Sequence, residues 1–230
     1  MFRLLDYPRF FWCMWTGKPY FGRIMGATQG SFFRYPLMGQ FLRERIKPGF
    51  NILEIGSWAG GSSLVFAKVC KEKNMGTVVC IDSWKNEGTY SPLMEKAQKR
   101  NRIFRLFSHN VFYSGVNDWI NIIRADTNYI LPLLAPLSFD MIYVDGSHAY
   151  SQVSKDIKNS LPLLKENGVI CGDDLELQYE NIDIDFARQN KEKDYIQDPK
   201  TGTFFHPGVC LAVYESFGKV EEEQGFWWKL

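Results

Sequence analysis

The sequence predicts an α/β fold with a doubly wound, mostly parallel sheet covered by helices on both faces. From Asn51 onward, short β-rich runs alternate with longer segments of helical spacing, and a glycine-rich turn follows the first run. The 230 residues, 45% of them hydrophobic, suit one domain with a sizeable core. We therefore expect a main domain over 37–230, preceded by an N-terminal aromatic arm over 1–36.

Five β-rich runs are predicted to be strands, at 51–55, 77–82, 121–125, 139–145 and 168–174. The segment from Ser62 to about Lys73 is predicted to be the first helix of this domain. Another helix is expected after Tyr150, because apolar residues recur at helical spacing until the Asn167-Gly168 breaker. Pro162 within it should end or kink the last turn.

The polar segment 176–208 lacks a clear pattern and is interpreted as a long loop. Loops of this length inside a compact domain are usually functional or mobile, so we expect it to act as a lid. HPGVCLAVYESFG (206–218) and GFWWKL (225–230) then read as two more β-like runs.

Composition narrows the classes of function. The 27 basic and 26 acidic residues nearly cancel, so no nucleic-acid partner is expected. Five cysteines without a CxxC pair favour free thiols in a reducing cytoplasm. The apolar start of the chain is interrupted by charged residues and Pro8, so neither a membrane span nor a signal peptide is predicted.

The arm is expected to pack on the domain or on a second subunit, which would make the protein a homo-oligomer. Contact of its aromatic residues with a membrane surface or an apolar substrate is the alternative.

The first candidate site is the turn LEIGSWAGGSS (53–63), which joins a strand to a helix. Gly56 and Gly60 let the backbone bend and approach a ligand, and the following helix offers free N–H donors. Trp58 occupies the place of the second glycine in a dinucleotide fingerprint, which disfavours a nicotinamide cofactor. A purely structural turn remains open.

Two further strand ends carry acids. Asp82 stands where nucleotide-binding α/β proteins place an acid that accepts hydrogen bonds from ribose hydroxyls. Asp126-Thr127 could contact an adenine, but an Asp-Thr pair before a helix is equally typical of an N-cap.

The most specific set is Asp145 in YVDGSHAY with Asp173 and Asp174 in VICGDD. Right-handed crossover geometry brings the ends of these successive strands together, and clustered carboxylates suggest a hard cation such as Mg²⁺. A simple turn at Asp145-Gly146 and a helix cap at Asp174 are the alternatives. His148 lies beside them at a helix start, which should lower its pKa and keep it neutral as a base. His109 and His206 are interpreted as structural.

These residues resemble those of class I S-adenosylmethionine-dependent methyltransferases, which have a Rossmann-like, seven-stranded sheet with an antiparallel last strand. More narrowly, the chain resembles metal-dependent O-methyltransferases that act on sugar hydroxyls of macrolides and related natural products. The matching motifs are LEIGSWAGGSS, IDSW, RADT, and IYVDGSHAY with LLKENGVICGDD.

The resemblance implies a role for each matching residue. The implied cofactor contacts are Gln40, Glu54, Gly56, Ser57, Gly60, Ser62, Asp82, Asp126 and Thr127. Asp145, Asp173 and Asp174 become ligands of Mg²⁺ or Mn²⁺, and His148 with Asp145 becomes catalytic. Some relatives carry an acid in place of Ser147, so its absence leaves His148 as the implied base.

The expected enzyme is an S-adenosylmethionine-dependent O-methyltransferase whose partner is a small, sugar-containing hydroxyl acceptor. The alternatives are a metal-independent methyltransferase, a dinucleotide-dependent oxidoreductase and a non-catalytic cofactor-binding partner protein.

Overall fold

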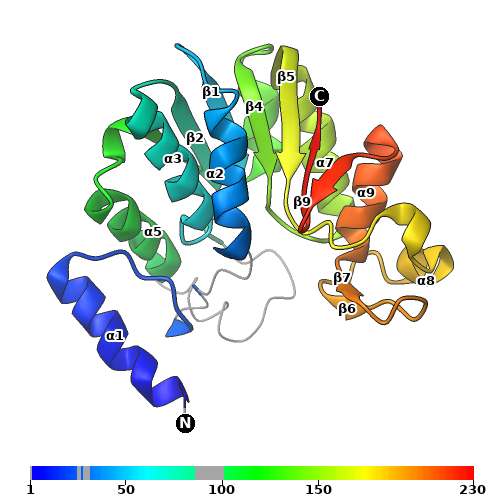
Figure 1. The fold of residues 1–230 in the computed structure, drawn as a ribbon, viewed down its shortest axis with the longest axis horizontal. Helices are drawn as coiled ribbons and strands as arrows, with labels where there is room; N and C mark the ends of the chain where they lie inside the picture. Colours follow the sequence, from blue (N-terminus) through cyan, green and yellow to red (C-terminus); the bar gives the residue numbers. More distant parts are fainter. Residues whose placement is uncertain (1, 25–26, 28–31, 86–100) are drawn as a thin grey trace. The chain divides into compact units, whose positions relative to one another are not determined.

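The computed structural model describes residues 2–24, 27, 32–85 and 101–230. Seven strands form one sheet in the order β3-β2-β1-β4-β5-β9-β8. Their bounds are β1 Asn51–Ile55, β2 Thr77–Asp82, β3 Ile120–Arg124, β4 Phe139–Val144, β5 Leu164–Gly172, β8 Glu221–Glu223 and β9 Phe226–Lys229. The predicted α/β class with a mostly parallel, seven-stranded sheet is thereby confirmed (Figure 1).

The chain divides into two compact units. The first comprises residues 1–49 and 57–125, and the second comprises 50–56 and 126–230. The predicted split into an arm over 1–36 and one domain over 37–230 stays a prediction, and each unit is described by itself.

In the first unit, β2 and β3 pair in parallel from Val78↔Ile120 to Asp82↔Arg124. Helix α3 (Gly61–Lys73) packs on β2, and α2 (Tyr35–Arg43) packs on α3. Helix α5 (Arg102–Tyr113) has an apolar face, from which Phe104 and Phe107 contact the buried ring of Trp84. α3 begins within one residue of its predicted start.

The aromatic arm forms helix α1 (Phe2–Thr16) within the first unit. Asp6 accepts hydrogen bonds from the Tyr20 hydroxyl at 2.7 Å and the Arg23 amide at 2.6 Å. Asn110 of α5 accepts from the Tyr20 amide at 2.8 Å. Within the first unit, these polar contacts hold the arm, and the bond between Tyr20 and Asn110 is buried. The predicted packing of the arm on the domain or on a second subunit stays a prediction. Residues 1, 25, 26 and 28–31 of the predicted arm lie outside the described residues.

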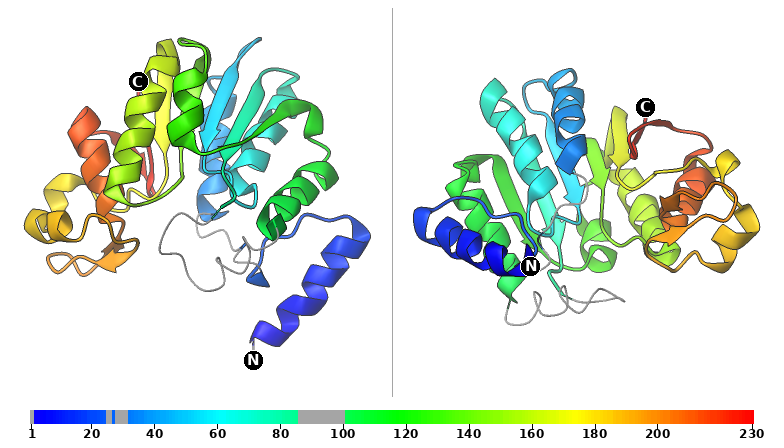
Figure 2. Two further views of the ribbon diagram at one scale, coloured as in Figure 1. Left: turned by 180° about the vertical axis from the view of Figure 1, so that it is seen from behind. Right: turned by 60° about the horizontal axis from the view of Figure 1, so that its bottom comes forward.

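In the second unit, β1, β4 and β5 pair in parallel, and β9 pairs antiparallel with both β5 and β8. The antiparallel last strand is therefore as expected. Helix α7 (Tyr150–Ser160) packs on β4, and α9 (Pro207–Phe217) packs on α7. The reverse view shows α7 in front of β5, on the face hidden in Figure 1 (Figure 2).

The helix after Tyr150 is shorter than predicted. It ends at Ser160, a 3₁₀ turn covers Leu161–Leu163, and β5 begins at Leu164. Pro162 ends the α-helix, as expected, since it has no amide hydrogen to continue the hydrogen-bond pattern. Asn167, with a φ of 60°, lies inside β5, where the pairing with β4 shifts register. The breaker therefore marks an irregularity within a strand and not a helix end.

The prediction of a strand over HPGVCLAVYESFG was wrong, because this segment forms α9. Pro207 occupies the first helical turn, and Gly218 follows the last residue. Residues 207–213 are all buried, so no polar face reveals the helical period.

The segment 176–208 is more regular than a loop. It contains a 3₁₀ turn at Tyr179–Asn181, helix α8 (Ile184–Gln189), and the hairpin of β6 (Ile196–Gln197) and β7 (Phe204–Phe205). Asp198 is fully buried and accepts hydrogen bonds from the amides of Asp183 and Thr201.

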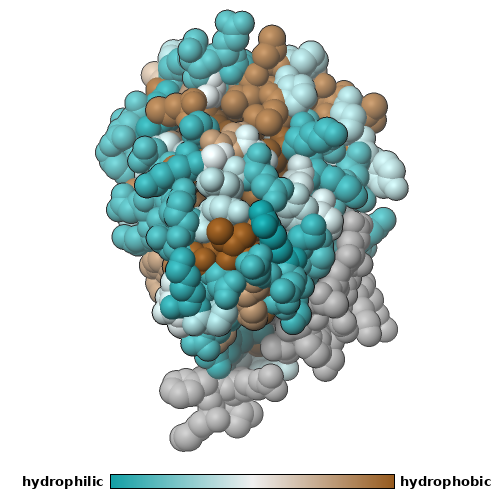
Figure 3. Space-filling view, turned by 90° about the vertical axis from the view of Figure 1, so that its right-hand side faces the viewer, coloured by the Kyte–Doolittle hydropathy of each residue, from teal (hydrophilic) through white to brown (hydrophobic). Residues whose placement is uncertain are grey.

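None of the helices in the described ranges is long and apolar enough to cross a bilayer. The face drawn in Figure 3 carries hydrophobic groups interleaved with hydrophilic ones.

Candidate active site

Gly56 is required by the approach of the β4 end to the turn after β1. Its φ is 90°, and a Cβ there would lie 2.0 Å from the Asp145 carbonyl oxygen. The Asp145 amide in turn donates to the Ile55 carbonyl at 2.8 Å. The contact that excludes a side chain is therefore the backbone of the second unit itself, whereas the sequence suggested a close approach to a ligand.

The rest of the glycine-rich turn belongs to the first unit and is organised by Asp82. Its carboxylate accepts from the amides of Trp58 at 2.8 Å and Trp84 at 2.6 Å. The Trp84 indole donates to the Trp58 carbonyl at 2.8 Å. Both tryptophans have positive φ, a conformation that costs free energy and is concentrated at functional sites.

Gly60, with a φ of 89°, precedes α3 and leads into its N-terminus. Ser57 and Ser62 are buried beside this turn, and Glu54 is fully buried on β1 of the other unit. Gln40 is exposed and donates to Glu44 on the next turn of α2. The cofactor roles expected for these residues and for Asp82 stay predictions.

Asp126 is the N-cap of helix α6 (Thr127–Ile130), since its carboxylate accepts from the Asn128 amide at 2.8 Å. The cap interpretation is confirmed, and adenine contact stays a prediction. Gln152 of α7 links this cap to a buried acid, because its amide donates to Thr127 at 3.2 Å and to Asp156 at 3.0 Å.

The carboxyl ends of β4 and β5 bring Asp145, His148 and Asp174 together, with one ligand atom of each within 4.8 Å of the others. His148 Nε2 lies 3.0 Å from Asp174 Oδ2, and the Tyr143 hydroxyl donates to Asp145 at 3.2 Å. Asp173 is buried at the same strand end, and its carbonyl accepts from the Trp227 indole. Within the described residues, Asp173 is not part of any such convergent group.

The surroundings of Asp145 disfavour its negatively charged form. Burial, followed by repulsion from Asp173 and Asp174, raises the pKa of Asp145 well above its ordinary value. The mutual repulsion expected of the three aspartates is therefore present, and a bound cation would relieve it.

His148 differs from the prediction of a neutral base. Burial alone would lower its pKa, but the carboxylates of Asp174 and Asp194 outweigh burial and raise the pKa well above the ordinary value. Asp194 Oδ1 lies 2.5 Å from His148 Nδ1. The adjacent carboxylates, not the start of α7, therefore determine its charge.

Three residues were not predicted as part of this site. His206, interpreted as structural, lies with its ring 4.4 Å from that of His148 and its Nδ1 3.1 Å from Glu176. Asp194 contacts His148, and Glu176 and Asp174 group with His206. These residues are far apart in sequence and have no common motif, so no local pattern could reveal them.

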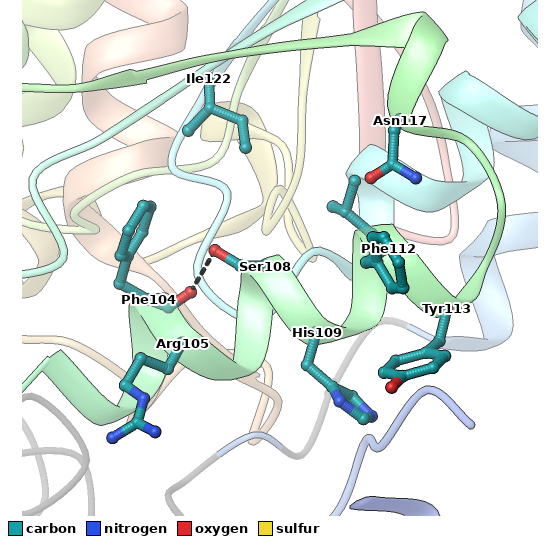
Figure 4. A pocket seen from close by; sticks show the side chains of 9 residues that line it. Phe104, Arg105, Ser108, His109, Phe112, Tyr113, Asn117 and Ile122 are labelled. Carbon is teal, nitrogen blue, oxygen red and sulfur yellow. Dashed lines mark hydrogen bonds between the residues drawn. The ribbon is translucent and has the colours of Figure 1, made fainter. Parts of the chain in front are cut away.

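A shallow pocket in the first unit involves other residues. It is lined along α5 by Phe104, Arg105, Ser108, His109, Phe112 and Tyr113, with Asn117 and Ile122 opposite (Figure 4). None of the residues predicted for cofactor, metal or catalysis lines it.

The mostly parallel, seven-stranded sheet with acids at its strand ends is the arrangement expected of a class I S-adenosylmethionine-dependent methyltransferase. The profile of the family described as "Methyltransferase domain" matches residues 53–175, more than half of the chain. The chain therefore belongs to this methyltransferase-domain family, and the match includes Gly56, Asp82, Asp145 and Asp174.

Known relatives agree with this assignment at the level of the fold. A Staphylococcus aureus structure, provisionally described as a caffeoyl-CoA O-methyltransferase, has a TM-score of 0.56 at 18% identity and covers 85% of this chain and 81% of its own. A Klebsiella pneumoniae structure, provisionally described as an O-methyltransferase, has a TM-score of 0.54 at 14% identity over 88% and 80% of the two chains.

The curated protein y4gI of Sinorhizobium fredii, of unassigned function, is 24% identical over 149 residues, which are 64% of this chain. The match spans 15% of the length of that relative. The family match confirms the expected methyltransferase class and supports S-adenosylmethionine as its methyl donor.

Proposed function

We propose that this protein is an O-methyltransferase that uses a divalent cation and acts on a hydroxyl of a small polyhydroxylated acceptor, such as a sugar. The convergence of Asp145, His148 and Asp174 at the carboxyl ends of β4 and β5 carries the proposal. Ligand sites in open α/β sheets lie at this edge.

The residues fit a cation. Asp145 and Asp174 supply carboxylate oxygens, the ligands that Mg²⁺ and Mn²⁺ prefer, and Asp173 adds negative charge from the same strand end. When bound, such a cation lowers the pKa of a hydroxyl, and S-adenosylmethionine supplies the methyl group. Aliphatic hydroxyls need this help more than thiols or amines do, which favours O-methylation.

His148 is proposed to take the hydroxyl proton at Nε2. Asp194, at Nδ1, fixes the orientation of the ring, as carboxylates do for catalytic histidines. With Asp174 at Nε2, however, the adjacent carboxylates raise the pKa of His148 and favour the doubly protonated ring, which cannot accept a further proton. Cation binding at Asp174 would compete with this proton, so metal binding and the basic form of His148 are thermodynamically linked.

The acceptor is proposed to bind under the segment 176–208. Its polar side chains suit a polyhydroxylated molecule, and Tyr195 is about half exposed, with its ring 4.8 Å from His206. The ring of Tyr179 stacks on that of Tyr214, with the ring centroids 3.8 Å apart, so one of its faces is covered.

Turnover of an acceptor panel tests this function. Glycosides and catechols would be incubated with S-adenosylmethionine, and methylated products detected by mass spectrometry, with excess chelator or with added Mg²⁺ or Mn²⁺. We expect glycoside methylation that chelation abolishes and metal restores. His148→Gln should lower kcat by about 100-fold or more, as for loss of a general base, whereas His109→Gln serves as the matched histidine control.

Two results would change the proposal. Full turnover in chelator would support the metal-independent methyltransferase, and a catechol turned over far better than every glycoside would exclude the sugar. We also propose that the protein has no nucleic-acid partner and lies in the cytoplasm. A homo-oligomer formed through the arm is a further proposal, which sedimentation of chains with and without α1 would test.

A further inference from the structure

Five side chains from four segments of the second unit converge next to Asp145. We call His148, Asp174, Glu176, Asp194 and His206 the histidine-carboxylate cluster. His148 Nδ1 lies 2.5 Å from Asp194 and its Nε2 lies 3.0 Å from Asp174. His206 Nδ1 lies 3.1 Å from Glu176, and its Nε2 lies 3.8 Å from Asp194. Two sets, His148-Asp194-His206 and Asp174-Glu176-His206, each bring three ligand atoms within 4.8 Å of one another.

Backbone packing holds the cluster in place. Gly208 at the start of α9 approaches the loop before α7 so closely that a Cβ would lie 2.2 Å from the His148 carbonyl oxygen. The Tyr150 amide donates to the Lys191 carbonyl at 2.9 Å, which brings in the chain that carries Asp194. The His206 amide donates to Glu176. These contacts fix His148 and His206 near each other, with their rings 4.4 Å apart.

The donor set is typical of a metal centre. It combines two imidazoles with three carboxylates, so ionised carboxylates leave it a negative net charge even when both rings are protonated. Ligand atoms about 2.0–2.2 Å from one ion are at most about 4.4 Å apart, so small side-chain rotations would bring either set onto an ion.

We infer that the histidine-carboxylate cluster binds a divalent first-row transition-metal ion. Mixed imidazole and carboxylate ligands favour ions such as Zn²⁺ and Co²⁺ over Mg²⁺, which prefers oxygen ligands alone. The inference assigns Glu176, Asp194 and His206 as ligands and ties segment 176–208 to the ends of β4 and β5. It does not rest on methyl transfer, because binding requires neither acceptor nor methyl donor.

Metal titration of the full chain tests the inference. Protein without a histidine tag would be freed of metal with chelator and dialysed. Zn²⁺, Co²⁺ and Mg²⁺ would then be titrated separately by calorimetry, with the cobalt absorption spectrum as a second readout. We expect saturable binding of Zn²⁺ and Co²⁺, and weaker binding of Mg²⁺. His206→Gln should weaken Zn²⁺ binding by about 100-fold or more, beyond the effect of an outer-shell partner.

Glu176→Gln and Asp194→Asn should also weaken Zn²⁺ binding, while His109→Gln, a histidine of the first unit outside the cluster, should leave it unchanged. Circular dichroism in chelator would confirm that each variant is folded. Absence of saturable Zn²⁺ and Co²⁺ binding, or equal affinity in the wild type and His206→Gln, would overturn the inference. Binding lost in Asp145→Asn but retained in His206→Gln would also overturn it, while supporting the proposed function.

Discussion

At the scale of single residues, the motifs locate the site, but contacts from distant segments determine its chemistry. Asp145 and Asp174 stand where the sequence places them, at the ends of β4 and β5. The charge of His148 could not be predicted, because Asp194 lies 46 residues away and contacts it only in the fold. His206 was missed for the same reason.

Gly56 gives a prediction at this scale. Gly56→Ala forces a Cβ into the Asp145 carbonyl at a φ of 90°, so we expect a loss of at least about 3 kcal/mol in unfolding free energy. Gly202→Ala is the matched control, since Gly202 has a φ of 71° with nothing within 4 Å, and should cost about 1 kcal/mol. Denaturant unfolding measures both, and equal losses would show that the contact with Asp145 is unimportant.

At the scale of elements, the local sequence pattern was sufficient to predict a helix or strand where a polar face showed its period or an acid stood at its end. β1, β2, β4 and α3 lie where predicted, within a residue or so. α9 was mistaken for a strand because burial on all sides erases the helical period. The 3₁₀ turn at Leu161–Leu163 and the irregular start of β5 depend on pairing with β4, which no local window contains.

Asp156 of α7 belongs to the hydrogen-bonded link between α6 and α7, and it predicts a free energy of unfolding that depends on pH. Burial raises the pKa of Asp156 from 3.8 to about 6. The folded protein therefore binds a proton at the Asp156 carboxyl more tightly than the unfolded chain does. The stability it contributes is present below pH 3.8 and is lost as the pH rises through about 6, a change of about 3 kcal/mol.

Asp156→Asn should remove this dependence, because asparagine does not titrate and still accepts a hydrogen bond from Gln152. Urea unfolding of wild type and variant between pH 4 and 8 measures the difference, which should grow in favour of the variant toward pH 8. Asp118→Asn, at an exposed position, is the control. A constant difference across this range would show that Asp156 does not titrate there.

At the scale of the whole molecule, the two ends of the parallel strands hold their acids in different surroundings. Asp140, near the start of β4, is buried and accepts from the Asn51 amide at 2.9 Å and from Lys165 at 2.6 Å, so it ties β1, β4 and β5 together. Asp145, just after β4, faces other acids instead. Sequence alone shows acids at both ends, and only the partners reveal which is structural.

This contrast gives paired predictions for Asp140 and Asp145. Asp140→Asn breaks the pair with Lys165 and should lower the free energy of unfolding by about 1–2 kcal/mol while leaving metal binding unchanged. Asp145→Asn removes one charge from a buried, mutually repelling cluster, so it should raise Tm in excess chelator while weakening metal binding. Thermal unfolding in chelator at pH 8 and calorimetric titration of Mg²⁺ measure the two effects. If Asp145→Asn lowers Tm without affecting metal binding, Asp145 is structural like Asp140. That result would contradict the proposal that the carboxyl ends of the strands bind the metal.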